Sequence, residues 1–327
     1  MRDLKDLPKA HLHLHLEGGM RRTTLEELSA HYGMEMPQIR GYGSFTAFSD
    51  MYEGACHVMQ TPDDLRRLAF ETVEDGLLAG AVYIEPSFYA PHHQAAFGDI
   101  EGIWEMMLDF FDQASQEYGV EVGIMMMCNR QVDPADAVVQ AKFAAKYAHR
   151  GIVSLGLSND EVGAPPELFV EAFRIGLDAG LLSAPHAGEL EGPHFITGSM
   201  ELLGAHRIQH GVRAFEQDGL VERIADSGIT LDVCPTSNIM LSIFPSFEEH
   251  PLGRLLDAGV RCSVNGDDPL LFGPGLLEEY QLCRDTFGFD DERMATIARA
   301  SIEGGGASAG VKAEALAGID AWLAQPA

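Results

Sequence analysis

The feature that most constrains the fold is a regular alternation between short apolar segments, rich in Val, Ile and Leu, and longer amphipathic segments. The amphipathic segments include PDDLRRLAFETVEDGLLAG and PPELFVEAFRIGLDAG, which begin with proline and acidic residues and end with glycine, as helices do. Eight apolar segments are expected as strands: residues 10–16, 81–87, 120–127, 151–157, 181–186, 205–210, 228–234 and 260–266. This pattern predicts an α/β fold, a parallel (β/α)8 TIM-type barrel, with a doubly wound open sheet as the alternative.

The length of 327 residues suits one barrel of this kind. We therefore expect a single domain over residues 1–327, without linker or internal repeat. Two segments exceed what the barrel needs: residues 34–60, expected as a lid-like insertion, and residues 288–327, expected as C-terminal helices. The glycine-rich segment 304–310 follows no strand, which indicates a helix break rather than a phosphate-binding loop.

The charge balance limits the partners of the chain. It has 22 basic and 50 acidic residues, a formal net charge of -28. So negative a surface repels nucleic acid and anionic membranes and favours a neutral or cationic small molecule. Five scattered cysteines, with no signal peptide and no apolar run of membrane-span length, predict a cytoplasmic protein. The oligomeric state is not indicated.

The segment HLHLHLEGG, residues 11–19, alternates histidine with leucine. In a strand this period of two places His11, His13 and His15 on one face, which must be the inner face of a barrel. Histidines two residues apart are separated by about 6.5 Å along a strand, so only adjacent pairs can share one metal ion. Because active sites of these barrels lie at the C-terminal strand ends, the pair His13 and His15 is favoured, and His11 becomes a supporting residue.

Other residues with suitable chemistry follow later strands. His186 and Glu189 in SAPHAGE come at the end of the fifth segment, His210 in RIQHG ends the sixth, and Asp267 and Asp268 in SVNGDDPLLFG follow the eighth. Each of these motifs alone could be a turn or a helix cap. All of them fall at C-terminal strand ends, which indicates one site that binds a metal and keeps a position open for water.

These motifs together resemble the adenosine deaminase family of zinc amidohydrolases. Five motifs occur in the same order as in that family: LPKAHLHLHLEG, HAGE, RIQHG, CPTSN and VNGDDPLLFG. The resemblance implies one zinc ion per chain, bound with a catalytic water by His13, His15, His186 and Asp267. The other zinc deaminase pattern, with HxE and PCxxC, is absent from the sequence.

The resemblance also assigns catalytic roles. Glu189 would handle a proton at the purine ring nitrogen N1, His210 would orient the water and stabilise the developing oxyanion, and Asp268 would hold N7. Attack of water at an aromatic carbon that bears an amine needs a strong nucleophile, a proton for the ring and an acid for ammonia. The chemistry of these residue types meets that need.

Two positions bear on the substrate. Glu17 stands where adenosine-specific relatives more often have Asp to hold the ribose hydroxyl, and Glu is frequent in relatives that act on free adenine or on other nucleosides. Asn159, in GLSNDE, stands where the family commonly has a glycine whose backbone N–H meets N3 of the purine. The segment 84–93 is expected to line the distal end of the pocket. Phe45 and Phe48 fit either an apolar lid or the core, and Ser237 and Asn238 of CPTSN fit either the pocket or a structural turn.

The sequence therefore predicts a zinc-dependent hydrolase that converts adenosine, or a close adenosine-type nucleoside, to its inosine form and ammonia. Adenine and a modified nucleoside such as aminodeoxyfutalosine are the alternative substrates, and a phosphorylated substrate ranks lower because of the charge. A non-catalytic binding protein on the same barrel would be favoured by loss of a ligand or of Glu189, which are all present. A phosphoester or lactam hydrolase would want a second metal bridged by lysine or carboxylate, and no strand segment contains lysine.

Overall fold

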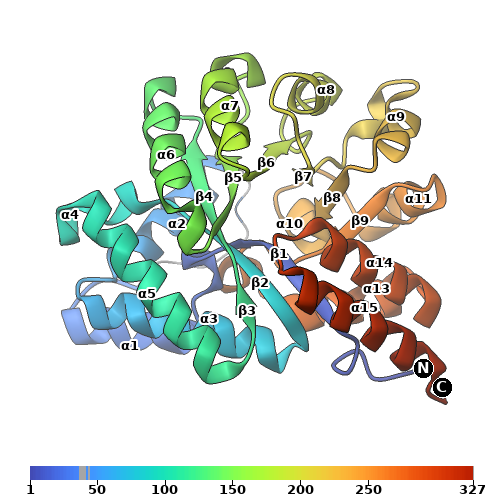
Figure 1. Ribbon diagram of the computed structural model, residues 1–327, viewed down its shortest axis with the longest axis horizontal. Helices are drawn as coiled ribbons and strands as arrows, with labels where there is room; N and C mark the ends of the chain where they lie inside the picture. The colour runs from blue at the N-terminus through green and yellow to red at the C-terminus, as the bar shows by residue number, and fades with distance from the viewer. Residues whose placement is uncertain (37–41, 43–44, 327) are drawn as a thin grey trace.

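Parallel strands occupy the centre of the computed structural model, which describes residues 1–36, 42 and 45–326 (Figure 1). Their order in the sheet is β1-β2-β4-β5-β6-β7-β8-β9, and β3 pairs only with β2. The strands are β1 Lys9–His15, β2 Ala81–Phe88, β3 Glu121–Val122, β4 Ile124–Asn129, β5 Ile152–Ser158, β6 Leu182–Ala187, β7 Arg207–His210, β8 Thr230–Val233 and β9 Arg261–Val264. All eight predicted segments are confirmed as strands.

The sheet closes between β1 and the residues that follow β9. The His15 N–H donates to the Asp267 carbonyl at 3.0 Å, and the Asp267 N–H donates to the His13 carbonyl at 3.1 Å. Sequential strand order with this closure confirms the TIM-type barrel and excludes the doubly wound sheet, in which the order reverses.

The third predicted strand is divided at Gly123 into β3 and β4. A side chain at this position would place its Cβ 2.2 Å from the Tyr83 hydroxyl and 2.7 Å from Val153. Only glycine fits here, so the division follows from close packing against neighbouring strands.

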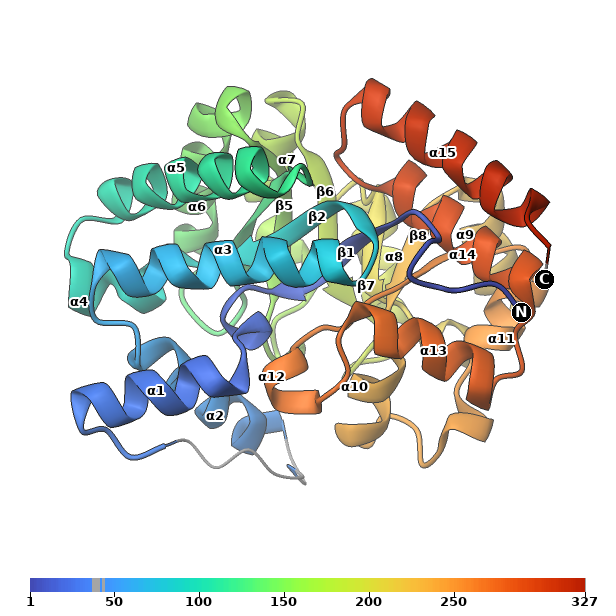
Figure 2. The same cartoon turned by 90° about the horizontal axis from the view of Figure 1, so that it is seen from below.

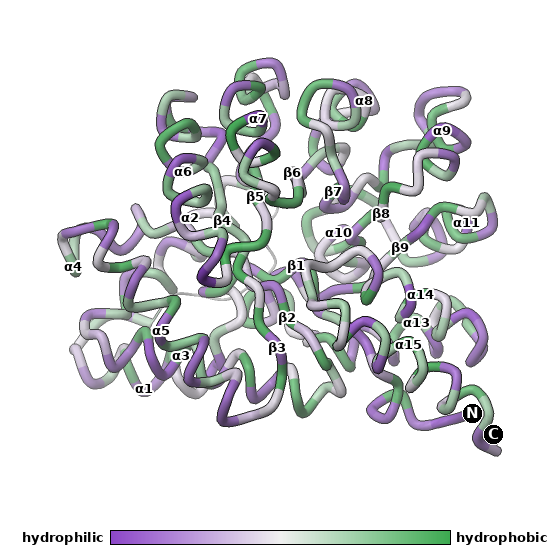
Figure 3. The backbone as a smooth tube through the Cα atoms, viewed as in Figure 1, coloured by the Kyte–Doolittle hydropathy of each residue, from purple (hydrophilic) through white to green (hydrophobic). Residues whose placement is uncertain are grey.

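Helices surround the barrel and alternate between hydrophilic and hydrophobic residues along their length (Figures 1 and 3). No helix in the described part of the chain is long and apolar enough to cross a membrane. The α-helices are α1 Arg22–Tyr32, α2 Phe45–His57, α3 Pro62–Leu78, α4 Gln94–Phe97, α5 Ile100–Tyr118, α6 Pro134–Tyr147, α7 Val170–Asp178, α8 Pro193–Glu201, α9 Leu220–Ser227, α10 Pro235–Met240, α11 Leu252–Asp257, α12 Pro269–Phe272, α13 Leu276–Thr286, α14 Asp291–Gly304 and α15 Ala309–Ala324.

Additional helices lie at the C-terminal end of the barrel. Figure 2 shows α1, α2, α10 and α12 together on one side of the molecule. α2 contacts the 3-10 turns Glu17–Gly19 and Ala90–His93, which follow β1 and β2. Part of the predicted lid-like insertion, residues 37–41 and 43–44, lies outside the described residues; its remainder includes α2, which covers the strand ends.

The opposite end of the barrel is held by a buried ionic network. Arg207 pairs with Glu85 at 2.5 Å and with Asp232 at 2.8 Å, and none of these side chains is exposed. Arg207 also donates to the Gly304 carbonyl at 3.1 Å, and Glu85 accepts the Gly306 N–H at 3.0 Å. The glycine-rich segment thus ends α14 and crosses close to this network, which confirms the predicted helix break.

Candidate metal and catalytic site

The histidines of β1 do not all share one face. The register of β1 against β2 shifts between His11 and Leu14. His11 accepts the Gly266 N–H at 3.0 Å and lines an outer cavity with Gly76 of α3 and Leu276 of α13. The expectation that His11 faces inward with the other two is wrong, because strict alternation does not survive this irregularity.

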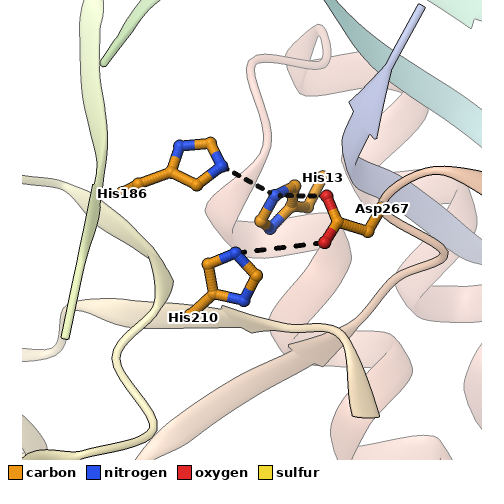
Figure 4. Close-up of side chains that lie close together, drawn as sticks. All are labelled: His13, His186, His210 and Asp267. Carbon is orange, nitrogen blue, oxygen red and sulfur yellow. Dashed lines mark hydrogen bonds and ion pairs between the residues drawn. The ribbon is translucent and has the colours of Figure 1, made fainter. Parts of the chain in front are cut away.

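His13 and His15 do point to the barrel centre, where they meet residues from distant strands. The His13 Nε2 atom lies 3.2 Å from His186 Nε2 and 3.1 Å from Asp267 Oδ1 (Figure 4). His15 Nε2 lies 3.3 Å from the same Asp267 oxygen. The geometry therefore brings together all four residues that the resemblance assigns to zinc.

The ring nitrogens that face away from this centre have partners of their own. His13 Nδ1 lies 3.1 Å from the Asp232 carbonyl, and His186 Nδ1 lies 3.0 Å from the Leu157 carbonyl. A carbonyl can only accept, so each Nδ1 carries the proton and each Nε2 presents a lone pair. Imidazole nitrogens and a carboxylate prepared in this way fit a metal such as Zn²⁺.

A fourth histidine, His210, lies at the same centre. Ligand atoms of His13, His186, His210 and Asp267 all fall within 4.8 Å of one another and form a buried metal site. His210 and Asp267 have positive φ angles of 67° and 58°. Residues other than glycine adopt this conformation at a cost of about 1–3 kcal/mol, which is typical of functional sites.

Glu189 lies beside this centre on the loop after β6. Its Oε2 is 3.4 Å from His210 Nε2, and its Oε1 has no hydrogen-bond partner among the described residues. Burial, and then the charges of Asp267 and Glu161, raise the pKa of Glu189 well above its usual value. A carboxyl group of this kind can carry a proton at neutral pH.

The loop of Glu189 is fixed by a carboxylate that sequence reasoning missed. Glu161 accepts the backbone N–H groups of Gly188 at 2.9 Å, Glu189 at 3.1 Å and Glu191 at 2.7 Å. Although Glu161 belongs to the noted segment GLSNDE, its role depends on backbone groups almost thirty residues further along. No local pattern indicates such a contact.

Asp268 has neither carboxylate oxygen paired among the described residues, although it is buried. Burial and the neighbouring charge of Asp267 raise its pKa well above the usual value. Gly18, in the turn after β1, leaves room for the Asp268 side chain, because a Cβ on Gly18 would lie 1.8 Å from Asp268 Oδ1. Two unpaired oxygens at a cavity wall are available to a ligand.

The cavity above the metal site has a volume of about 780 Å³, which includes space open to solvent. His15, Glu189 and Asp268 line its inner part, and Asn159, with a φ angle of 80°, lines one wall. Outer walls come from α2 and from the end of β2 with the turn that follows it, as predicted for residues 84–93; they include Phe45, Phe48, Ser49, Tyr52, Ser87, Tyr89 and His92. Phe48 also stacks on Phe272 at 5.1 Å, so it serves both the cavity and the core.

Glu17 is placed behind this wall. It is fully buried; its Oε1 lies 2.6 Å from His93 Nε2, and its Oε2 accepts the Tyr52 hydroxyl at 2.5 Å. Burial alone would raise the pKa of Glu17, but the hydrogen bond and charge of His93 hold it below its usual value. Both Glu17 oxygens therefore already have partners, two residues that the sequence did not single out.

A parallel barrel with a buried His and Asp metal site beside an unpaired carboxylate defines a metal-dependent hydrolase. Residues 8–322 match the family model described as "Adenosine deaminase". The chain belongs to the adenosine deaminase family, and it is a hydrolase of the adenosine/adenine deaminase type.

Two similar relatives cover almost the whole chain. A Streptomyces coelicolor protein, provisionally named adenosine/adenine deaminase, is 40% identical over 99% of this chain and 98% of its own length. An adenine deaminase from Chelativorans sp. is 34% identical over 91% of this chain and 93% of its own length.

Solved structures agree with the fold. The adenine deaminase of Arthrobacter aurescens has a TM-score of 0.90 at 27% identity, with 97% of this chain and 99% of that chain covered. A Burkholderia ambifaria amidohydrolase solved with bound zinc has a TM-score of 0.88 at 24% identity, with 98% of this chain and 94% of that chain covered.

Proposed function

We propose that this protein is a zinc-dependent aminohydrolase whose preferred substrate is free adenine, which it converts with water to hypoxanthine and ammonia. The observation that carries the choice of substrate is the pairing of both Glu17 oxygens with His93 and Tyr52. Because Glu17 is fully buried and is not one of the described residues that line the cavity, a ribose hydroxyl in the cavity does not reach the carboxylate at the position where adenosine-specific relatives place an aspartate. The names of the adenine deaminases in the family support the same substrate.

Zinc would be held by His13, His15, His186 and Asp267, whose donor atoms converge in the barrel. The zinc bound to the Burkholderia ambifaria relative supports this choice of metal. When bound, zinc lowers the pKa of a coordinated water to about 7 and so supplies a strong nucleophile at neutral pH.

The residues around the metal site would move and hold protons. Glu189, whose pKa is raised, would donate a proton to the ring nitrogen next to the attacked carbon. His210 would hydrogen-bond the attacking oxygen, and Asp268, with its unpaired oxygens, would bind the far side of the ring. Of the two protons of the attacking water, one would replace the proton that Glu189 gives to the ring, and the other would pass through Glu189 to the amine, which then leaves as ammonia.

Adenosine, the first expectation from the sequence, is the second candidate. The cavity volume of about 780 Å³ leaves room beyond a purine base, so a nucleoside such as adenosine or aminodeoxyfutalosine remains a competing substrate. Nucleotides are disfavoured because the cavity wall holds Glu53, Glu189, Asp267 and Asp268, and no lysine or arginine among the described lining residues.

An ultraviolet assay of the zinc-loaded protein with adenine, adenosine, deoxyadenosine and 5'-modified adenosines tests this assignment. We expect kcat/KM to be highest for adenine. A higher value for any nucleoside would overturn the choice of free base while leaving the deaminase assignment intact. Deamination of none of them would overturn the proposed function itself.

A further inference from the structure

A chain of hydrogen bonds leads from His210 away from the metal site to residues that have no assigned role. The His210 Nδ1 atom lies 3.2 Å from the amide nitrogen of Asn238, in the motif CPTSN on α10. The Asn238 Oδ1 atom lies 3.1 Å from His250 Nε2, and His250 Nδ1 lies 3.3 Å from the backbone nitrogen of Leu252. His210, Asn238 and His250 are all buried.

The direction of these hydrogen bonds follows from their outer end. The backbone N–H of Leu252 can only donate, so His250 Nδ1 must accept and its proton must lie on Nε2. The His250 N–H then donates to Asn238, which fixes the amide with its oxygen toward His250. The amide nitrogen, which can only donate, therefore faces His210 Nδ1.

The surroundings of His250 keep this chain neutral. His250 contacts the rings of Phe244 and Phe287 at centroid distances of 5.4 and 5.8 Å. Burial lowers the pKa of His250 to about 4. At neutral pH one ring nitrogen thus accepts and the other donates, as the hydrogen bonds require.

We propose that His250 and Asn238 are positioning residues that hold His210 as the tautomer with its proton on Nε2, directed into the catalytic site. The His210 Nε2 atom lies 3.4 Å from Glu189 Oε2 and 4.0 Å from Asp267 Oδ2. A protonated Nε2 donates to the attacking oxygen and cannot bind the metal. Although His210 belongs to the buried metal site, the fourth ligand is then His15.

This inference rests on the proposed function for its effect on turnover, but the tautomer can be measured without any substrate. The measurement is the ¹⁵N spectrum of histidine-labelled, zinc-loaded protein, with the His210 signals identified by their loss in His210→Gln. We expect His210 to have an unprotonated Nδ1 and a protonated Nε2. The reverse pattern, or a metal-bound Nε2, would overturn the proposal even if the enzyme deaminates adenine as expected.

Asn238→Asp reverses the polarity at nearly constant shape, because a carboxylate accepts where the amide nitrogen donated. We expect the His210 proton to move to Nδ1 and kcat to fall at least about a hundredfold, with bound zinc retained; a comparable change of tautomer in a serine protease costs about 10⁴ in kcat. Unchanged kcat together with an unchanged spectrum would contradict the proposal.

Position 250 offers a matched pair that does not introduce a charge. His250→Phe removes the donor to Asn238, whereas His250→Gln keeps a side-chain N–H for it. We expect kcat to fall about tenfold in the first variant and to recover most of that loss in the second. Equal losses in the two variants would show that His250 acts only by filling space.

Discussion

Among single residues, three buried carboxyl groups of the site differ in the direction in which their pKa values are shifted. The pKa of Glu189 and the pKa of Asp268 are raised, first by burial and then by the charge of Asp267. Burial acts in the same direction on Asp267, but His13 and the other histidines hold its pKa well below the usual value. One carboxylate is thus prepared for a metal, while two keep a proton available for a substrate.

Glu189→Gln tests the proton carried by one of these groups. The amide preserves size and hydrogen bonding but cannot transfer a proton, so kcat should fall by about 10²–10⁴. Zinc content, measured by metal analysis, should stay at the wild-type value because Glu189 is not among the proposed ligands. Turnover close to that of the wild type would exclude Glu189 as the proton carrier.

Gly18→Ala tests the placement of Asp268. The added Cβ would lie 1.8 Å from Asp268 Oδ1 and must displace that side chain. We expect KM for adenine to rise about tenfold, since a buried polar group of the bound base that loses its hydrogen-bond partner costs about 1–3 kcal/mol. The neighbouring Gly19→Ala is the control, because its Cβ would only approach Leu14 at 3.2 Å; similar KM values in the two variants would refute the explanation.

The residues that sequence analysis found share one property: each acts through its own place in a strand or at a strand end. His13, His15 and Asp267 were found in this way, and the barrel brings them together. Glu161 and His250 were not found, because each acts through a hydrogen bond to a residue distant in the chain or to a backbone group. Composition and spacing carry no signal for such contacts.

At the scale of elements, β1 departs from the alternation that its sequence suggests. The Asn265 side chain accepts the N–H of Leu12 at 2.8 Å and the N–H of His13 at 3.1 Å, where the register of β1 shifts. Two consecutive N–H groups on one acceptor do not occur in a regular strand, in which they point to opposite sides. This side-chain contact, and not the period of two, sets which histidines face the site.

Asn265→Ala should therefore weaken both the strand and the metal site. Two buried N–H groups would lose their acceptor, at a cost of about 1–3 kcal/mol each in the free energy of unfolding. Zinc affinity should fall by about 10- to 100-fold because His13 loses its support. Ser301→Ala is the control: it removes the acceptor of another buried N–H of β1, that of Ala10 at 2.9 Å, and should change zinc affinity less. Denaturant unfolding and zinc titration measure the two effects, and wild-type zinc affinity in Asn265→Ala would contradict this account of β1.

At the scale of the whole molecule, buried histidines should make the fold sensitive to acid. The pKa of His250 is lowered from 6.5 to about 4 by burial. The unfolded chain therefore binds this proton near pH 6.5 and the folded protein only near pH 4, so stability falls as the pH drops between these values. The contribution amounts to about 3 kcal/mol at the acid end.

His250→Phe removes this group and should flatten the pH dependence of the free energy of unfolding between pH 6.5 and 4. Denaturant unfolding at several pH values, compared with the wild type, measures the difference. Above pH 6.5 the offset between the two proteins should be constant. An equal slope in both proteins below pH 6.5 would show that His250 takes up no proton on unfolding.

The barrel itself was predictable because eight apolar segments, helices between them and chemistry at the strand ends all agree. The proposed preference for a base over a nucleoside could not be predicted from the sequence, because it rests on which residues pair with the Glu17 carboxylate. Tyr52 and His93, its partners, come from two different segments, and only the folded chain places them behind the cavity wall.

Zinc-dependent deamination is tested by a zinc titration of the metal-free protein, with deamination of adenine as the readout. We expect no turnover without metal, a linear rise with added zinc and saturation at one zinc per chain, with one ammonia released per hypoxanthine formed. Full turnover in the metal-free protein, or no deamination of adenine or adenosine at saturating zinc, would contradict zinc-dependent deamination.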